Sequence, residues 1–195
     1  MSWRISVVAG ALIFVILTST PLVVGLFTDG QAASHVLGQS LFTTSSPALT
    51  QTGMDLTTGI ALDSSGNIWV ADVSHNRILE FSPPFTDGQA ASHVLGQSLF
   101  TTNGYATTQT GMNNPFGVAF DSSGNLWVAD ANNNRVLEFS PPFTDGQAAS
   151  HVLGQSDLTS GVYATTQTGM YLPTGVAFDS SGNIWVADAL NNRIL

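Results

Sequence analysis

Apolar residues form one long run at the start of the chain and many short runs after it. Residues 5–26 contain no charge, and as a helix these 22 residues would span about 33 Å, roughly one bilayer core. We therefore predict an N-terminal hydrophobic helix in residues 1–26, either a membrane anchor or a signal peptide. Arg4 would stay cytoplasmic, so the remainder is expected to be extracytoplasmic, membrane-anchored or secreted. No A-x-A site follows, which favours the anchor, whereas Pro21 leaves cleavage open.

Residues 27–195 alternate short apolar runs with polar turns, a pattern typical of β-strands. In the middle of the chain, strands are predicted over residues 117–121, 126–130, 135–140 and 150–155. Residues 122–125 form a hairpin turn, and Pro141-Pro142 ends the third strand because proline cannot donate to a ladder. No window has the period of an amphipathic helix, so we expect an all-β domain.

This pattern repeats with a period of 58 residues. The segment FTDGQAASHVLGQS occurs identically at residues 27–40, 85–98 and 143–156. A second block, GVAFDSSGNLWVAD in the middle copy, recurs from Gly59, Gly117 and Gly175. The units are residues 27–84, 85–142 and 143–195, the last one truncated. Such similarity indicates an array of one repeated structure.

Each predicted sheet is apolar on both faces, as Leu126-Trp127-Val128-Ala129 illustrates. A sheet of this kind needs a neighbour on each side, which a radial stack of four-stranded antiparallel blades provides. We therefore predict a β-propeller. A linear β-solenoid is the alternative fold, although its repeats are usually shorter.

Residues 115–139, PFGVAFDSSGNLWVADANNNRVLEF, resemble an NHL repeat, and the adjoining HVLGQ segment resembles exported bacterial and archaeal NHL proteins. The resemblance extends over residues 27–195. It implies a propeller, often of six blades. Members of this family include RNA binders, receptor ectodomains, scaffolds and a peptide-amidating lyase, so the resemblance leaves the chemistry open.

The units amount to an incomplete ring of about three blades, fewer than the four to eight of known propellers. A fourth strand is expected over residues 34–39, ahead of the first complete blade. We expect a truncated sequence, because Leu195 falls within a strand whose counterparts continue as Glu80-Phe81 and Glu138-Phe139. Alternatively, two chains build one ring. Open blade edges are expected to favour self-association.

The composition argues against some partners. Four Arg and no Lys stand against thirteen acids, for a net charge of −9. Binding to nucleic acid needs a clustered basic surface, so no nucleic-acid partner is predicted. The absence of cysteine excludes disulfides and thiolate zinc sites.

Polar residues that recur in every unit are interpreted as structural. Asp and Arg five positions apart are expected to form ion pairs between second and third strands: Asp72–Arg77, Asp130–Arg135 and Asp188–Arg193. The recurring histidines lack metal-ligand spacing, the turn carboxylates are too few for calcium, and the recurring tryptophans are expected in the core. These residues are His35, His93 and His151; Asp63, Asp121 and Asp179; and Trp69, Trp127 and Trp185.

The copies differ mainly in the linkers before each first strand and in the turns between second and third strands. In a propeller these loops open on one face, where aromatic and amide side chains are suited to binding. Candidate partner-binding residues are Tyr105, Asn113, Asn114, Tyr163, Tyr171 and His75. Tolerated drift in loops is the alternative explanation, and His75 is expected to be a solvated turn residue.

We therefore expect an exported or membrane-anchored binding or scaffold module for a protein, peptide or glycan, and not an enzyme. Catalysis needs asymmetric groups around one reacting centre, and units this similar do not supply them. No catalytic residue, metal or cofactor is predicted. The alternative is a propeller enzyme, a lyase or lactonase-like hydrolase, whose catalytic residues lie in a missing C-terminal part.

Overall fold

The computed structural model describes residues 28–195, and residues 34–195 form one compact unit. The hydrophobic helix predicted over residues 5–26, as anchor or signal peptide, lies outside the described residues. Within residues 28–195, no helix has the length and apolar character that crossing a bilayer requires.

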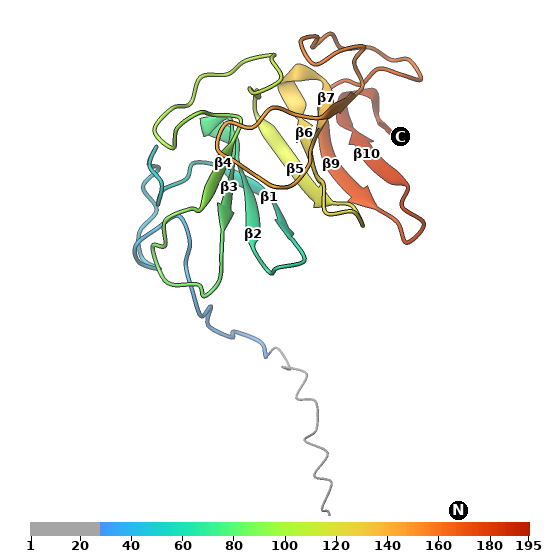
Figure 1. Cartoon of the computed structure of the whole chain (residues 1–195). Helices are drawn as coiled ribbons and strands as arrows, with labels where there is room; N and C mark the ends of the chain where they lie inside the picture. The colour runs from blue at the N-terminus through green and yellow to red at the C-terminus, as the bar shows by residue number, and fades with distance from the viewer. Residues whose placement is uncertain (1–27) are drawn as a thin grey trace, which may run out of the picture. The chain divides into compact units, whose positions relative to one another are not determined.

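Three antiparallel sheets make up the compact unit, and we call them the first, second and third blade (Figure 1). The first contains β1 (Thr57–Leu62), β2 (Ile68–Asp72), β3 (Arg77–Phe81) and β4 (His93–Leu95). The second contains β5 (Pro115–Phe120), β6 (Leu126–Asp130), β7 (Arg135–Phe139) and β8 (His151–Leu153). The third contains β9 (Pro173–Phe178), β10 (Ile184–Asp188) and β11 (Arg193–Ile194).

Within each blade the strands pair in chain order, as the sequence predicts. A single 3₁₀ turn joins the second and third strands of each blade: η1 (Val73–His75), η2 (Ala131–Asn133) and η3 (Ala189–Asn191). The asparagine after each turn adopts a left-handed conformation, with φ of 54° at Asn76 and 53° at both Asn134 and Asn192. Asparagine tolerates this conformation better than most residues, so the repeated Asn-Arg step suits a tight return into the third strand.

The fourth strands differ from the sequence prediction in two ways. β8 covers only residues 151–153, because Gly154 adopts a φ of 87° and turns the chain away from the sheet. Residues 34–39 form no strand, since the described part of the chain provides no third strand ahead of them for pairing. Instead, the backbone N–H of Val36 donates to Oδ1 of Asp87 at 3.0 Å.

The first strands of the three blades, β1, β5 and β9, lie next to one another (Figure 1). A Cβ at position 59 would lie 2.2 Å from the carbonyl oxygen of Phe116, and one at position 117 would lie 2.6 Å from that of Thr174. Gly59 and Gly117 therefore allow a backbone approach that any side chain would prevent. The blades are stacked closely along this edge.

Aromatic side chains fill the space between blades, and we call this contact the tryptophan seam. Trp69 is fully buried, with ring centroids 4.5 Å from Phe143 and 5.9 Å from Phe120. At the next junction, Trp127 lies 6.0 Å from Phe178. Antiparallel sheets stacked face to face in this manner are β-propeller blades.

Trp185 departs from the prediction that all three repeated tryptophans belong to the core. Its side chain is 49% exposed, because the described chain places no further blade against that side of the third blade. Burial of this tryptophan therefore depends on a neighbouring blade and not on its own unit.

Candidate binding face on the bridging loops

Three long segments each precede the first strand of a blade, and we call them the bridging loops: residues 40–56, 96–114 and 154–172. Each ends against the 3₁₀ turn of the blade that follows it. The N–H of Asn132 donates to the Asn113 carbonyl at 3.1 Å, and Leu190 makes the same contact with Tyr171 at 3.1 Å. The two kinds of loop that vary between copies are therefore in contact at the same end of each blade.

The Asp and Arg residues predicted to pair do lie in contact in all three blades. Nε of each Arg is 2.7 Å from Oδ2 of its Asp: Asp72–Arg77, Asp130–Arg135 and Asp188–Arg193. Both partners are fully buried in the first two blades, whereas the Arg193 side chain is 27% exposed. Buried charges need further hydrogen bonds to be tolerated, and the bridging loops supply them.

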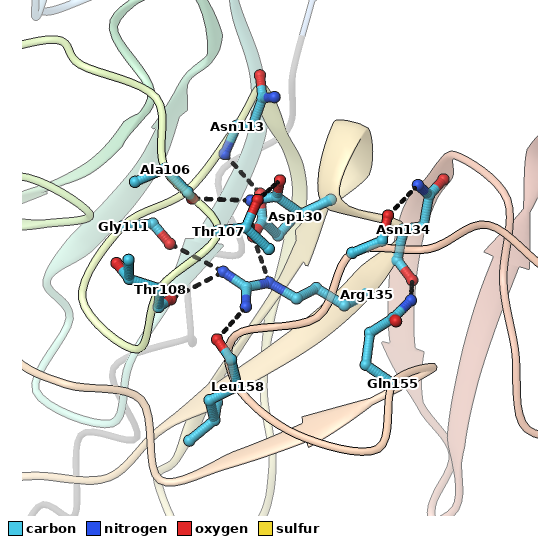
Figure 2. A network of polar contacts seen from close by, with 12 residues as sticks. Ala106, Thr107, Thr108, Gly111, Asn113, Asp130, Asn134, Arg135, Gln155 and Leu158 are labelled. Carbon is cyan, nitrogen blue, oxygen red and sulfur yellow. Dashed lines mark hydrogen bonds and ion pairs between the residues drawn. The ribbon is translucent and has the colours of Figure 1, made fainter.

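The guanidinium of Arg135 binds two different bridging loops (Figure 2). Nη2 donates to the carbonyls of Thr108 at 2.9 Å and Gly111 at 3.0 Å, both in the loop before the second blade. Nη1 donates to the carbonyl of Leu158, in the loop after it, at 2.5 Å. Arg77 makes the corresponding contacts with Thr50, Gly53 and Phe100. Each of these arginines therefore holds successive loops together.

The aspartate of each pair also accepts hydrogen bonds from residues other than its arginine. Oδ1 of Asp130 accepts a hydrogen bond from the N–H of Asn113 at 2.6 Å (Figure 2). Oδ2 accepts a hydrogen bond from Nδ2 of Asn133 at 2.9 Å. In the third blade, burial raises the pKa of Asp188, but donors from Tyr171, Asn191 and Arg193 outweigh burial and lower it overall. We call each Asp–Arg pair with its loop partners a polar hub.

A second set of contacts, which the sequence reasoning missed, surrounds Asn134 (Figure 2). Its side chain donates to the Gly161 carbonyl at 2.9 Å and accepts the N–H of Leu172 at 3.0 Å. Its own carbonyl accepts Nε2 of Gln155 at 2.8 Å. The sequence does contain a signal for these contacts, because one asparagine and one glutamine recur every 58 residues. They are Asn76, Asn134 and Asn192, and Gln39, Gln97 and Gln155.

His75 is not the solvated turn residue that the sequence suggested, and it is poorly placed for a partner. The residue is only 7% exposed, and its Nδ1 lies 2.9 Å from Oδ2 of Asp72. It occupies the position that Asn133 has in the next blade, where Nδ2 contacts Asp130 in the same way. His75 is therefore part of the first polar hub.

All three predicted tyrosines lie on the bridging loops, two of them exposed and Tyr171 partly buried. Tyr105 is 74% exposed and Tyr163 is 63% exposed. Tyr163 stacks on Tyr171, with ring centroids 4.7 Å apart and planes inclined by 27°. Two of the bridging loops adjoin, because a Cβ at position 161 would lie 3.0 Å from Cγ2 of Thr107. We call Tyr105, Tyr163 and Tyr171 the tyrosine face.

Asn113 and Asn114 contact the polar turn of the second blade. Nδ2 of the exposed Asn132 donates to Oδ1 of Asn113 at 3.3 Å and to Oδ1 of Asn114 at 3.1 Å. The backbone N–H of Asn114 also donates to Oδ1 of Asn76 at 2.8 Å. These amides form part of the loop framework and are partly buried beside the tyrosine face.

At the opposite ends of the blades, the hairpin turns are built around single carboxylates. Oδ1 of Asp121 accepts the N–H groups of Ser123 and Asn125, and Oδ2 accepts the side chains of Asn125 and Trp127. Burial raises the pKa of Asp121, but these bonds outweigh burial and lower it. Within the described residues, no three His, Asp or Glu side chains gather as a metal site would require.

The sequence was also compared with known proteins. The NHL repeat model matches residues 58–81, 112–139 and 170–195. These segments cover the first three strands of each blade. Among curated proteins, none matches the sequence.

Several solved structures are similar in fold. A streptogramin B lyase is 16% identical over 71% of this chain, with a TM-score of 0.44. A luciferin-regenerating enzyme is 16% identical over 74%, with a TM-score of 0.46. A gluconolactonase from Xanthomonas campestris is 19% identical over 71%, with a TM-score of 0.46. The match covers 36%, 41% and 36% of those chains, respectively.

These neighbours contradict the sequence-based prediction that the chain is not an enzyme. That prediction rested on the similarity of the repeat units, whereas the solved structures with similar blades are a lyase, a luciferin-regenerating enzyme and a gluconolactonase. The similarity of the repeat units does not decide whether the chain is an enzyme, because a fold does not fix its function.

Proposed function

Because the chain belongs to the NHL-repeat proteins, we propose that its propeller blades form a binding module whose tyrosine face contacts a protein, peptide or glycan partner. The observation that carries this proposal is the pairing of exposed aromatic rings with a loop backbone that is hydrogen-bonded to a buried arginine. Tyr105 and Tyr163 are 74% and 63% exposed, on loops whose backbone carbonyls accept hydrogen bonds from Arg135. The proposal concerns binding and is compatible with a reaction in the whole protein.

Loops that are hydrogen-bonded to a buried arginine favour a high affinity for a partner. A tyrosine offers a large contact area with little side-chain entropy to lose, and a fixed backbone removes much of the cost of ordering the loop. The rings of Tyr163 and Tyr171 already stack on each other in the chain without a partner. A partner would therefore meet a pre-organised surface.

The charge of the chain narrows the chemistry of the partner. With a net charge of −9 and no Lys, the chain repels polyanions and favours neutral or basic surfaces. Aromatic rings suit the apolar faces of sugars and of aliphatic or proline-rich peptide segments, while the tyrosine hydroxyls can exchange hydrogen bonds with polar groups.

The test compares two double variants of the full chain on peptide and glycan arrays. Tyr105→Ala/Tyr163→Ala removes the exposed rings, and the matched control Ser122→Ala/Ser180→Ala alters exposed residues of the hairpin turns. We expect signals of the wild-type chain to survive in the control and to fall about tenfold or more in the tyrosine variant. Equal signals in both variants would rule out the tyrosine face.

We further propose that residues 1–26 direct export, as a membrane anchor or a signal peptide, so that the blades are extracytoplasmic. The charge-free run after Arg4 supports this proposal. Alkaline phosphatase fused after Leu195 should be active, because it folds only outside the cytoplasm. A fusion that also lacks residues 5–26 is the control and should be inactive. Equal activity with and without the segment would refute the proposed role.

A further inference from the structure

A pocket lies among the β1–β2 hairpin turn of the first blade, the β5–β6 hairpin turn of the second, and the segment that follows β7. Its volume is about 330 Å³, within the range of small-ligand sites. Its lining includes Asp63, Glu80 and His93 together with small turn residues, and also the apolar residues Pro141, Pro142 and Phe143. No Lys or Arg lines it.

Glu80 is the unusual member of this pocket. Its side chain is only 7% exposed, and its Oε2 is buried without a hydrogen-bond partner in the described structure. The nearest cationic candidate, Nε2 of His93, is 4.0 Å away, too far for a hydrogen bond. Burial raises the pKa of Glu80, and the charge of His93 opposes this only in part. A buried carboxylate oxygen without a donor is costly for the fold.

The equivalent glutamate in the second blade shows why Oε2 of Glu80 lacks a hydrogen-bond donor. There, His151 turns toward Glu138, with Nδ1 2.5 Å from Oε2. In the first blade, His93 instead contacts Asp145 of the next blade, with Nδ1 3.1 Å from Oδ1. Stacking a blade therefore draws the histidine away from its glutamate, and this leaves the carboxylate beside a pocket.

From these contacts we infer that the pocket binds a primary ammonium group on an unbranched alkyl chain, with Glu80 as its counter-ion. The carboxylate supplies the charge and the unused acceptor, while Pro141, Pro142 and Phe143 supply apolar walls for methylene groups. A neutral hydroxyl compound could donate a hydrogen bond but would leave the charge of Glu80 uncompensated. Asp63 adds negative potential, although its own oxygens are occupied by Ser65, Asn67 and Trp69.

Two sources of this ligand are distinguished by the probes. A free amine is represented by n-butylammonium, and a lysine side chain of a partner by Nα-acetyl-lysine methylamide. Binding to the full chain is followed by NMR shifts of Glu80 and Phe143, with n-butanol as the neutral control. If butylammonium binds at least as tightly as the lysine derivative, the site takes free amines. If the lysine derivative binds more tightly, the site takes a lysine side chain.

Two matched substitutions test the role of the carboxylate. Glu80→Gln keeps the shape and should weaken amine binding by about tenfold or more, the usual effect of losing a charged hydrogen bond. Glu138→Gln changes the histidine-paired counterpart and should leave binding unaltered. Because Nε2 of His93 is 4.0 Å from Oε2 and makes no hydrogen bond to it, His93→Ala should bind amines about as tightly as the wild-type chain.

Loss of binding can be separated from loss of folding. The raised pKa of Glu80 means that its ionised form destabilises the fold above that pKa, so Glu80→Gln should melt no lower than wild type at neutral pH. The tyrosine variants should bind amines normally, which separates this inference from the proposed function. Binding of neither amine, equal binding of n-butanol, or unchanged binding by Glu80→Gln would overturn the proposal.

Discussion

The polar hubs and the tryptophan seam are built from the same repeat, yet they respond differently to position. The Asp–Arg distance is 2.7 Å in all three blades. Exposure of the repeated tryptophan, in contrast, is zero at Trp69 and 49% at Trp185. The core of a hub is formed by a blade and the loop before it, whereas the seam exists only where another blade follows.

The polar hubs and the tryptophan seam therefore have different structural roles. The hubs fix the bridging loops, and thereby the tyrosine face, one blade at a time. The seam joins blades into an array through nearest-neighbour contacts, the form of stability expected for repeat proteins. Substitutions in each region should therefore differ in how strongly their effects depend on blade number.

The largest effect is expected in a hub. Arg135→Ala leaves Asp130 buried without its counter-ion and frees three loop carbonyls, so the free energy of unfolding should fall by about 5 kcal/mol. Arg193→Ala is the comparison, because that side chain is 27% exposed, and it should cost less than half as much. Urea denaturation gives both values. Losses below about 1 kcal/mol in both variants would show that the hubs do not stabilise the loops.

Substitutions in the tryptophan seam should have the next largest effect on the free energy of unfolding. That effect should depend more strongly on which blade carries the substitution. Trp69→Ala removes a fully buried ring that contacts Phe120 and Phe143, and should cost about 3–4 kcal/mol. Trp185→Ala, its matched counterpart in the third blade, should cost under about 1 kcal/mol. The same denaturation measurement applies. Equal costs would mean that the third blade has a neighbour in solution, as the self-association expected from open edges would provide.

Sequence reasoning succeeded where a feature is local to one unit. Strand order, the hairpin turns and the Asp–Arg spacing all follow from residues within a few positions of each other, repeated at a fixed period. It failed where the outcome depends on a neighbour: residues 34–39 form no strand, and Trp185 is exposed.

The same limit explains one of the two features that were missed at the candidate sites. His75 appears as an unrepeated turn residue in the sequence, but its neighbour Asp72 is already placed to receive it. The unpaired carboxylate oxygen of Glu80 depends on Asp145, which is 65 positions later in the sequence and belongs to another blade. The three-residue spacing of Asp72 and His75 within one unit could have indicated the first arrangement, whereas no spacing within a unit could have indicated the second.

A smaller and opposite effect is expected where a bridging loop meets its blade. Leu172 adopts a φ of 52°, a left-handed conformation that is unfavourable for leucine, while the second blade has Asn114 at this position with a φ of 53°. Leu172→Asn should therefore stabilise the chain by about 0.5–1 kcal/mol. The reciprocal change, Asn114→Leu, should destabilise it by a similar amount. A melting temperature that moves in the same direction in both variants would contradict this explanation.

The weakest expected effect concerns the hairpin turns and acid pH. Hydrogen bonds from Asn183 and Trp185 lower the pKa of Asp179 from 3.8 to about 2. A carboxyl with a lowered folded-state pKa stabilises the fold above its unfolded pKa, and this contribution is lost as pH falls through the folded value. The difference in melting temperature between wild type and Asp179→Asn should thus shrink from pH 4 to pH 2. A constant difference would disprove the linkage.

The central claim is that exposed tyrosines stand on loops that buried hubs hold rigid, and native-state hydrogen exchange tests it directly. The amides of Asp55, Asn113 and Tyr171 each donate to a hub carboxylate, at 2.7, 2.6 and 2.6 Å. We predict that these three amides exchange as slowly as those of the central strands, although they lie in long loops. Exchange at the rate of an unstructured peptide would contradict the account.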